Sequence, residues 1–123
     1  MSRDPAKLRV YHHAHGLVLA VFRHGEAFPR DQRFIIRQQL YRAVLSTVCN
    51  IVEGCARRTS NEYRHFINVA LGSAREAAYL IDLSGELSYL QVTAIDDCRS
   101  RCKAVVGSLQ NLARALEKND GKG

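Results

Sequence analysis

Residues 95–116, IDDCRSRCKAVVGSLQNLARAL, carry the clearest helical pattern in the chain. The apolar residues of this stretch recur at alternating steps of three and four, which is the spacing of one face of an α-helix. They are Ile95, Cys98, Cys102, Val105, Leu109, Leu112 and Leu116. A stripe of this kind has to be buried against other helices, so it predicts one member of an all-α bundle.

The same spacing recurs three times before this stretch. It predicts helices over residues 8–26, 31–57, 60–87 and 93–118, followed by a flexible polar tail over residues 119–123. Pro29 interrupts the chain between the first two helices, and candidate capping residues precede the other three: Asp31, Thr59 and Thr93. Thr59 and Thr93 are each followed three residues later by an acid, as in a capping box.

Chain length and short connections define the architecture that these helices form. The 123 residues suit a single domain, here spanning residues 1–123, and 46% hydrophobic against 24% charged residues is the balance of a folded chain. Short links force neighbouring helices to run antiparallel. We therefore predict an up-and-down antiparallel four-helix bundle.

Several classes of function lack the residues that they require. No apolar run is long enough to span a bilayer and no signal-peptide stretch opens the chain, so we expect a cytoplasmic protein without membrane contact. The four cysteines fit reduced core residues, and the group His12, His13 and His15 has no carboxylate or cysteine at a suitable spacing. Without a glycine-rich phosphate loop either, we expect no metal and no cofactor.

The positive charge is concentrated in one half of the chain. Residues 1–58 carry ten Lys and Arg against four acids, whereas residues 59–123 carry eight against eight. Arginine supplies 14 of the 18 basic residues, and its planar fork suits phosphate. The candidate nucleic-acid-binding residues are Arg30, Arg33 and Arg37 at the start of the second helix and Arg57 and Arg58 at its other end. An ordinary solvated helix face is the alternative explanation of these arginines.

A polar stripe follows the second helix at steps of three and four: Gln39, Arg42, Ser46, Asn50, Glu53 and Arg57. It fits either a solvated face or a hydrogen-bonded seam against the third helix or a second subunit. Ser73 and Glu76 on the third helix belong with it, and we expect Glu53 to pair with an arginine. Because no nucleophile with an adjacent base is visible among them, we predict no catalytic residues. The residues assigned to structure or an interface are Arg42, Ser46, Asn50, Glu53, Ser73 and Glu76.

One enzymatic alternative has a definite pattern. Some helical-bundle nucleases use an arginine followed a few residues later by a histidine, and Arg58 with His65 fits that loose spacing. The arginine would stabilise a phosphorane and the histidine would transfer the proton. Such pairs arise easily by chance in a chain with fourteen arginines.

The segments QLYRAVLSTVCNIVEGCARR (39–58) and EYRHFINVALGSAREA (62–77), together with LRVYHHAHGLVLAVF (8–22), resemble a known family. It comprises the four-helix bundle proteins encoded in intervening sequences of bacterial 23S ribosomal RNA genes. The resemblance covers most of residues 8–90. The positions that carry it are Gln39, Leu40, Ser46, Asn50, Ile51, Glu53, Gly54, Arg57, Phe66, Asn68, Ala70, Leu71, Ser73 and Glu76.

The resemblance implies a homopentameric four-helix bundle without established enzymatic activity. Related proteins of similar fold act as accessory factors in diversity-generating retroelements, where they bind nucleic acid and a reverse transcriptase. Two departures concern Val48, where the family often has proline, and Tyr11, where it often has tryptophan. Since Val48 keeps its N–H, the second helix is expected to be straighter here.

The leading hypothesis is a non-enzymatic homo-oligomer that binds nucleic acid, RNA rather than DNA, or a nucleoprotein, through its arginine-rich face. The rival hypothesis is a protein-interaction scaffold whose positive charge meets an acidic protein partner. A helical-bundle ribonuclease is the third possibility.

Overall fold

The computed structural model describes residues 3–31 and 34–120, with side chains up to residue 118. A short 3-10 helix, Pro5–Lys7, precedes four α-helices: α1 (Arg9–Gly25), α2 (Phe34–Cys55), α3 (Ser60–Glu86) and α4 (Val92–Asp120). No strand occurs in this part of the chain. The prediction of an all-α fold is confirmed.

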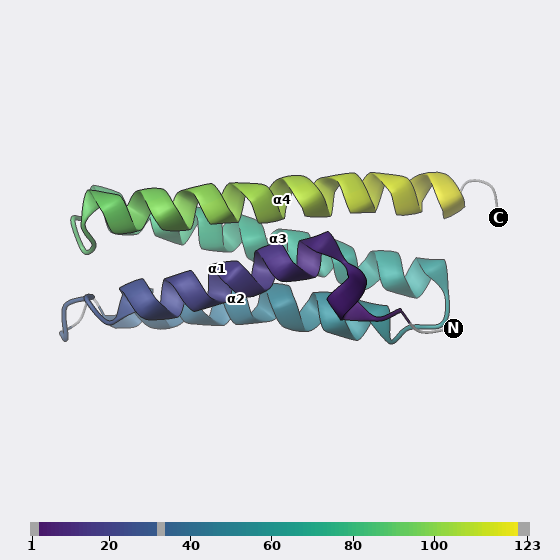
Figure 1. Cartoon of the computed structure of the whole chain (residues 1–123). Coiled ribbons are helices and arrows are strands. Elements are labelled where there is room, and N and C mark those ends of the chain that lie inside the picture. The colour runs from purple at the N-terminus through teal and green to yellow at the C-terminus, as the bar shows by residue number, and fades with distance from the viewer. Residues whose placement is uncertain (1–2, 32–33, 121–123) are drawn as a thin grey trace.

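The four helices lie lengthwise beside one another and alternate in direction (Figure 1). Each helix packs on the next one in the sequence, and α4 closes the bundle by packing on α1. The diagonal pairs, α1 with α3 and α2 with α4, make no comparable contact. This is the up-and-down antiparallel arrangement that the short connections predict.

The core consists of the apolar faces that the periodicity identified. Its largest fully buried side chains include Leu17 of α1, Leu40 and Ile51 of α2, Ile67 and Ile81 of α3, and Leu109 of α4. Six of the seven residues in the apolar stripe of α4 are buried. Leu112 is the exception and is only partly buried against the core.

Small residues bring α3 close to its neighbours inside this chain. Ala70, Ala74 and Ala77 have no exposed surface. On α2, a Cβ added at Gly54 would lie 3.1 Å from side-chain atoms of both Phe66 and Tyr63, so glycine permits a close approach to α3 there. Gly72 is different, because nothing lies within 4 Å of the position that its Cβ would take. Most of the small-residue face of α3 is thus used within the bundle.

The second helix is shorter than the 31–57 expected from the sequence. Its amide at Phe34 donates to the carbonyl of Asp31 at 2.9 Å, but residues 32 and 33 lie outside the described part, so the capping role of Asp31 stays a prediction. At the other end, the amide of Arg57 donates to the carbonyl of Gly54 at 3.1 Å, a tighter turn than an α-helix makes. Arg57 therefore lies just past the helix. Val48 lies within a continuous α2.

The two capping signals gave different outcomes. Thr59 precedes α3, and its hydroxyl oxygen accepts a hydrogen bond from the amide of Glu62 at 3.1 Å, as predicted. The prediction that Thr93 caps the fourth helix is wrong. This helix already begins at Val92, and the amide of Ile95 donates to the carbonyl of Gln91 at 3.0 Å. This helix also continues to Asp120, so the expected tail starts as helix, and residues 121–123 lie outside the description.

We expect Ile67→Ala to lower the free energy of unfolding by about 2–5 kcal/mol, because Ile67 is 0% exposed and its loss opens a cavity in the core. The matched control is Ile35→Ala on α2. Ile35 is 64% exposed, so this change should stay within about 0.5 kcal/mol. Urea denaturation of both variants measures the difference. Equal losses would contradict the assignment of the core.

Candidate nucleic-acid interface

The N-terminal segment folds back onto the turn between α2 and α3 (Figure 1). The backbone amide of Arg3 donates to the carbonyl of Cys55 at 2.7 Å, and its guanidinium donates to the carbonyl of Arg57 at 3.5 Å. The guanidinium carbon lies 3.9 Å from the centroid of the Tyr63 ring. The guanidinium thus lies just past the C-terminal end of α2, which carries partial negative charge and favours a cation. Nothing in the local sequence pattern signals this contact.

Burial keeps the groups beneath this contact neutral. It raises the pKa of the Cys55 thiol and of the Tyr63 hydroxyl above their ordinary values. Neither group is therefore a nucleophile or base at neutral pH. Among the described residues, arginines and a lysine supply the permanent positive charge at this end of the bundle.

Basic side chains outnumber acids at this end. In residues 3–12 and 53–65 there are six Lys and Arg against three acids, Asp4, Glu53 and Glu62. The basic residues, which we call the turn cluster, are Arg3, Lys7, Arg9, Arg57, Arg58 and Arg64. Sequence analysis identified only Arg57 and Arg58, because the other four join them through the folded-back N-terminus and the start of α3.

Arg57 and Arg58 differ in their contacts with other side chains of the protein. Arg57 pairs with Glu53 at 3.1 Å, and its guanidinium carbon lies 5.6 Å from the Phe66 ring centroid. Arg58 is exposed and forms no ion pair within the described residues. Arg58 is therefore the more available phosphate ligand of the two.

The predicted patch at the start of α2 is less uniform than its spacing suggested. Arg30 is exposed but lies in the loop before the helix, and Arg33 is outside the described residues. Arg37 is only partly exposed, because its guanidinium lies over the rings of Phe34 and Tyr41, 4.5 and 4.9 Å from their centroids. The two predicted patches occupy opposite ends of α2, as expected.

The middle of the polar stripe forms a hydrogen-bonded seam between α2 and α3. The hydroxyl oxygens of Ser46 and Ser73 lie 2.8 Å apart. The side-chain amide of Asn50 donates to the carbonyl of Ser46 at 2.8 Å and to its hydroxyl at 3.2 Å. The remaining predicted interface residues, Arg42, Glu53 and Glu76, are exposed. The stripe is thus a seam at its centre and a solvated face toward its ends.

The pair considered for a ribonuclease lies on the surface. Arg58 is in the turn, and the exposed His65 ring packs edge-on against Phe66, with 5.2 Å between ring centroids. Elsewhere, His12 Nε2 lies 2.7 Å from the carbonyl of Ala6. Among the described residues, no three His, Cys, Asp or Glu side chains gather as metal ligands.

Three cysteines are buried, as expected of core residues, whereas Cys49 is exposed on α2 and corrects that expectation for one of the four. Burial raises the pKa of Cys98 and of Cys102 to about 11. Both thiols are therefore protonated at neutral pH. They act as small apolar side chains.

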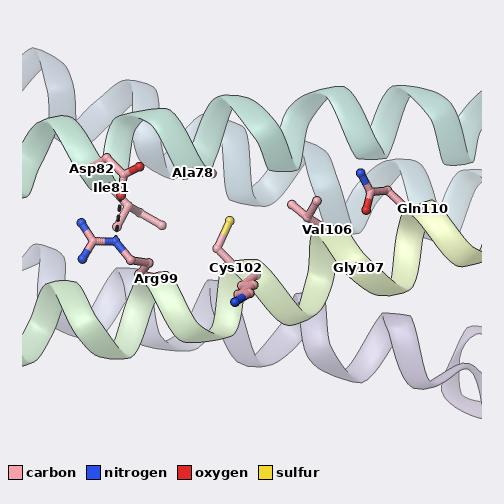
Figure 2. A pocket seen from close by; sticks show the side chains of 9 residues that line it. Ala78, Ile81, Asp82, Arg99, Cys102, Val106, Gly107 and Gln110 are labelled. Carbon is pink, nitrogen blue, oxygen red and sulfur yellow. Dashed lines mark hydrogen bonds and ion pairs between the residues drawn. The ribbon is translucent and has the colours of Figure 1, made fainter.

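An apolar hollow of about 460 Å³ lies between α3 and α4 (Figure 2). Cys102 faces it, and its thiol donates to the carbonyl of Ala74 at 3.4 Å. The guanidinium of Arg99 donates to Asp82 at 2.9 Å on its rim, the ion pair drawn in Figure 2. With a protonated thiol and a satisfied ion pair, this hollow holds no activated nucleophile.

A polar cluster that the sequence did not reveal joins α1 to α4. Asp97 of α4 lies 2.8 Å from His24 Nε2 of α1 and accepts from Arg101 Nε at 2.9 Å. Arg23 adds a longer ion pair at 3.7 Å. The hydrogen bond with His24, followed by that from Arg101, lowers the pKa of Asp97 below its ordinary value. The sequence separation of 73 residues between His24 and Asp97 explains why periodicity could not predict the pair.

The fold and its surface define a four-helix bundle with a basic cluster at one end, and sequence comparison gives its family. The model of the 23S rRNA-intervening sequence protein family matches residues 6–111, so the chain belongs to this family. The resemblance identified on α1, α2 and α3 is therefore confirmed. A search of curated proteins finds no significant match.

A solved structure supports the same fold. It is a crystal structure of a protein with unknown function from the S23 ribosomal protein family of Bacteroides thetaiotaomicron. It is 17% identical, superposes with a TM-score of 0.78, and the match covers 85% of this chain and 97% of that one. At this identity the likeness concerns the fold alone. No described helix is long and apolar enough to cross a membrane.

We expect Asp97→Asn to lower the free energy of unfolding at pH 7 by about 1 kcal/mol, since the cluster is partly exposed. The folded-state pKa is depressed, so the stabilisation is present above the ordinary pKa near 3.8 and is lost as pH falls through the lower folded value. Thermal melts of both proteins from pH 7 down to about pH 2 should therefore converge. A difference that stays constant with pH would contradict the ionic origin of this contribution.

Proposed function

We propose that this protein is a cytoplasmic, non-enzymatic homo-oligomer that binds nucleic acid, RNA in preference to DNA. The observation that carries the proposal is the turn cluster. Its six Lys and Arg stand against three acids on the α2–α3 turn, the start of α3 and the N-terminal segment, which docks on that turn through Arg3. Arg30 and Arg37 lie at the other end of α2, where Glu26 and Asp31 line the same pocket, so the described residues of that pocket carry no excess of positive charge.

Phosphate binding is the use that suits the turn cluster best. Arginine presents several N–H donors in a plane and pairs with two phosphate oxygens at once. Contacts with phosphates give affinity without sequence information, and no described element has the pattern of a base-reading domain. We therefore propose binding that depends strongly on salt and little on sequence.

Apolar side chains on the outer surface support self-association. Val52 on α2 is 42% exposed and Val69 on α3 is 39% exposed, and in the sequence both lie between the Ser46–Ser73 seam and the α2–α3 turn. The open space at Gly72 lies on the same part of α3. Exposed apolar groups beside a polar seam are typical of a protein interface. Five copies are favoured by the resemblance to the family, and rotational repetition would turn each basic cluster into a ring.

These apolar residues also favour a second candidate function, a protein-interaction scaffold. In that case the outer surface of α2 and α3 would bind a different, acidic protein. One measurement distinguishes the two functions: the binding of RNA by the purified protein at different salt concentrations. Only the first function requires salt-dependent binding. The variants below distinguish phosphate contacts from unspecific attraction.

The first test removes one cation from the turn cluster. If one site neutralises about four phosphates, log affinity for single-stranded RNA should fall against log salt with a slope near −3. Arg58→Gln should make that slope shallower by about 0.7, because one phosphate contact is lost. The control Arg75→Gln removes the same charge from the middle of α3 and should leave the slope unchanged. Equal effects of the two variants would refute a localised site.

The second test concerns assembly. Light scattering at micromolar concentration should give a multiple of the 13.8 kDa chain mass, and a monomer would refute self-association. The exposed Glu53–Arg57 pair contributes only about 0.3–0.5 kcal/mol within one chain. A loss of mass, or a larger loss of stability, in Glu53→Ala therefore indicates a contact between copies. The control is Glu117→Ala near the end of α4, which should change neither quantity.

A further inference from the structure

A stack of aromatic rings and a guanidinium lies on the outer surface between α1 and α2. The rings of Phe22 and Tyr41 are stacked with centroids 3.9 Å apart and an angle of 16° between their planes. The guanidinium carbon of Arg37 lies 4.9 Å from the centroid of the Tyr41 ring and 4.5 Å from the centroid of the Phe34 ring. Phe22 is 36% exposed, so the stack reaches solvent at this residue.

Packing on α1 fixes the position of Tyr41. A Cβ at Gly25 would overlap the phenol ring, so glycine is required for Tyr41 to lie against the backbone of α1. The Tyr41 hydroxyl and the Nε of Arg37 are both buried without a hydrogen-bond partner in the described structure. Their positions are therefore set by stacking and packing. Phe22 is the exposed member of the stack, whereas Phe34, Arg37 and Tyr41 are half-buried.

A hollow of about 680 Å³ adjoins Phe22. Its polar wall consists of the exposed side chains of Gln38, Gln39 and Arg42, and its apolar wall includes Phe22 and Leu45. Arg42 forms no ion pair among the described residues. An aromatic face, two amides and an unpaired guanidinium thus converge on one hollow.

We propose that this hollow binds an unpaired nucleotide, with its base stacked on Phe22 and its phosphate held by Arg42. The proposal rests on the nucleic-acid binding proposed above and assigns that function to single strands. A base presents a flat face to the ring and a hydrogen-bonding edge to the amides of Gln38 and Gln39. In a duplex the base faces are covered by their neighbours, so a duplex can engage only the basic groups.

Charge and hydrogen bonding favour this occupant over a second copy of the chain. An apolar helix seated in the hollow would bury the two amides and Arg42 without partners, which is unfavourable. Nucleic acid supplies both the missing negative charge and the hydrogen-bonding groups.

The test compares a fluorescein-labelled single-stranded RNA of mixed sequence with the same strand in a duplex. Phe22→Leu keeps an apolar side chain on Tyr41 but removes the flat ring. It should weaken binding of the single strand about tenfold and leave duplex binding unchanged. Tyr79→Leu, the same kind of change at a 65% exposed aromatic residue on α3, is the control and should alter neither.

A second readout does not depend on affinity. The chain contains no tryptophan, so Phe22→Trp introduces a single tryptophan at the stack, whose emission can be excited apart from that of the five tyrosines. Saturating single-stranded RNA should quench its emission through base stacking, whereas duplex RNA should not. Tyr79→Trp places the fluorophore away from the hollow and should respond to neither. Circular dichroism of each variant shows that the bundle is intact.

The outcomes separate this inference from the proposed function. Suppose that the wild-type protein binds RNA, and that Phe22→Leu weakens binding of single strand and duplex equally or weakens neither. Base stacking on Phe22 is then refuted, whereas phosphate binding by the turn cluster is not. If the wild-type protein binds neither form at low salt, both proposals fail. If Phe22→Leu changes the oligomeric mass and leaves RNA binding intact, the surface is a contact between copies and the inference is wrong.

Discussion

The close packing of α2 on α3 is the constraint on which the rest of the structure depends. Gly54 lets the side chains of Tyr63 and Phe66 pack against the backbone of α2, and the buried alanines of α3 hold the helices together along their length. This contact fixes the turn between them and places Tyr63 under Arg3. The folded-back N-terminus, and with it the composition of the turn cluster, follows from the packing of two helices.

The sequence predicted the elements because each helix carries its own evidence. The apolar stripe of α4 and the Thr59 cap of α3 are local signals, and the structure bears out both. The prediction was wrong at Thr93. The Thr93–Asp96 spacing is that of a capping box, but Thr93 lies one residue inside a helix that begins at Val92. It could not reach contacts between distant segments. The His24–Asp97 pair and the docking of Arg3 at Cys55 join residues with no common period in the sequence.

The candidate site shows the same division. Spacing identified Arg57 and Arg58, but only the fold shows that Glu53 engages the first and that the second is exposed. Spacing also grouped Arg30 with Arg37, whereas the structure puts one in a loop and the other over two aromatic rings. The number of arginines in a stretch is therefore a poor guide to the charge available for a ligand. Ion pairs and ring contacts within the chain decide how much of it is free.

This distinction explains the uneven charge of the two halves of the chain. Two of the three arginines of α4 are used internally: Arg99 pairs with Asp82 at 2.9 Å, and Arg101 pairs with Asp97 at 2.9 Å. The Arg99–Asp82 pair joins α4 to α3, and Arg101 binds the same Asp97 that contacts His24 of α1. Acids therefore accompany these bases in the second half of the sequence. In the first half, Arg42 and Arg58 have no such partner in the described structure. Helix packing does not require their charge, so Arg42 and Arg58 belong either to an ordinary solvated surface or to the ligand contacts proposed above.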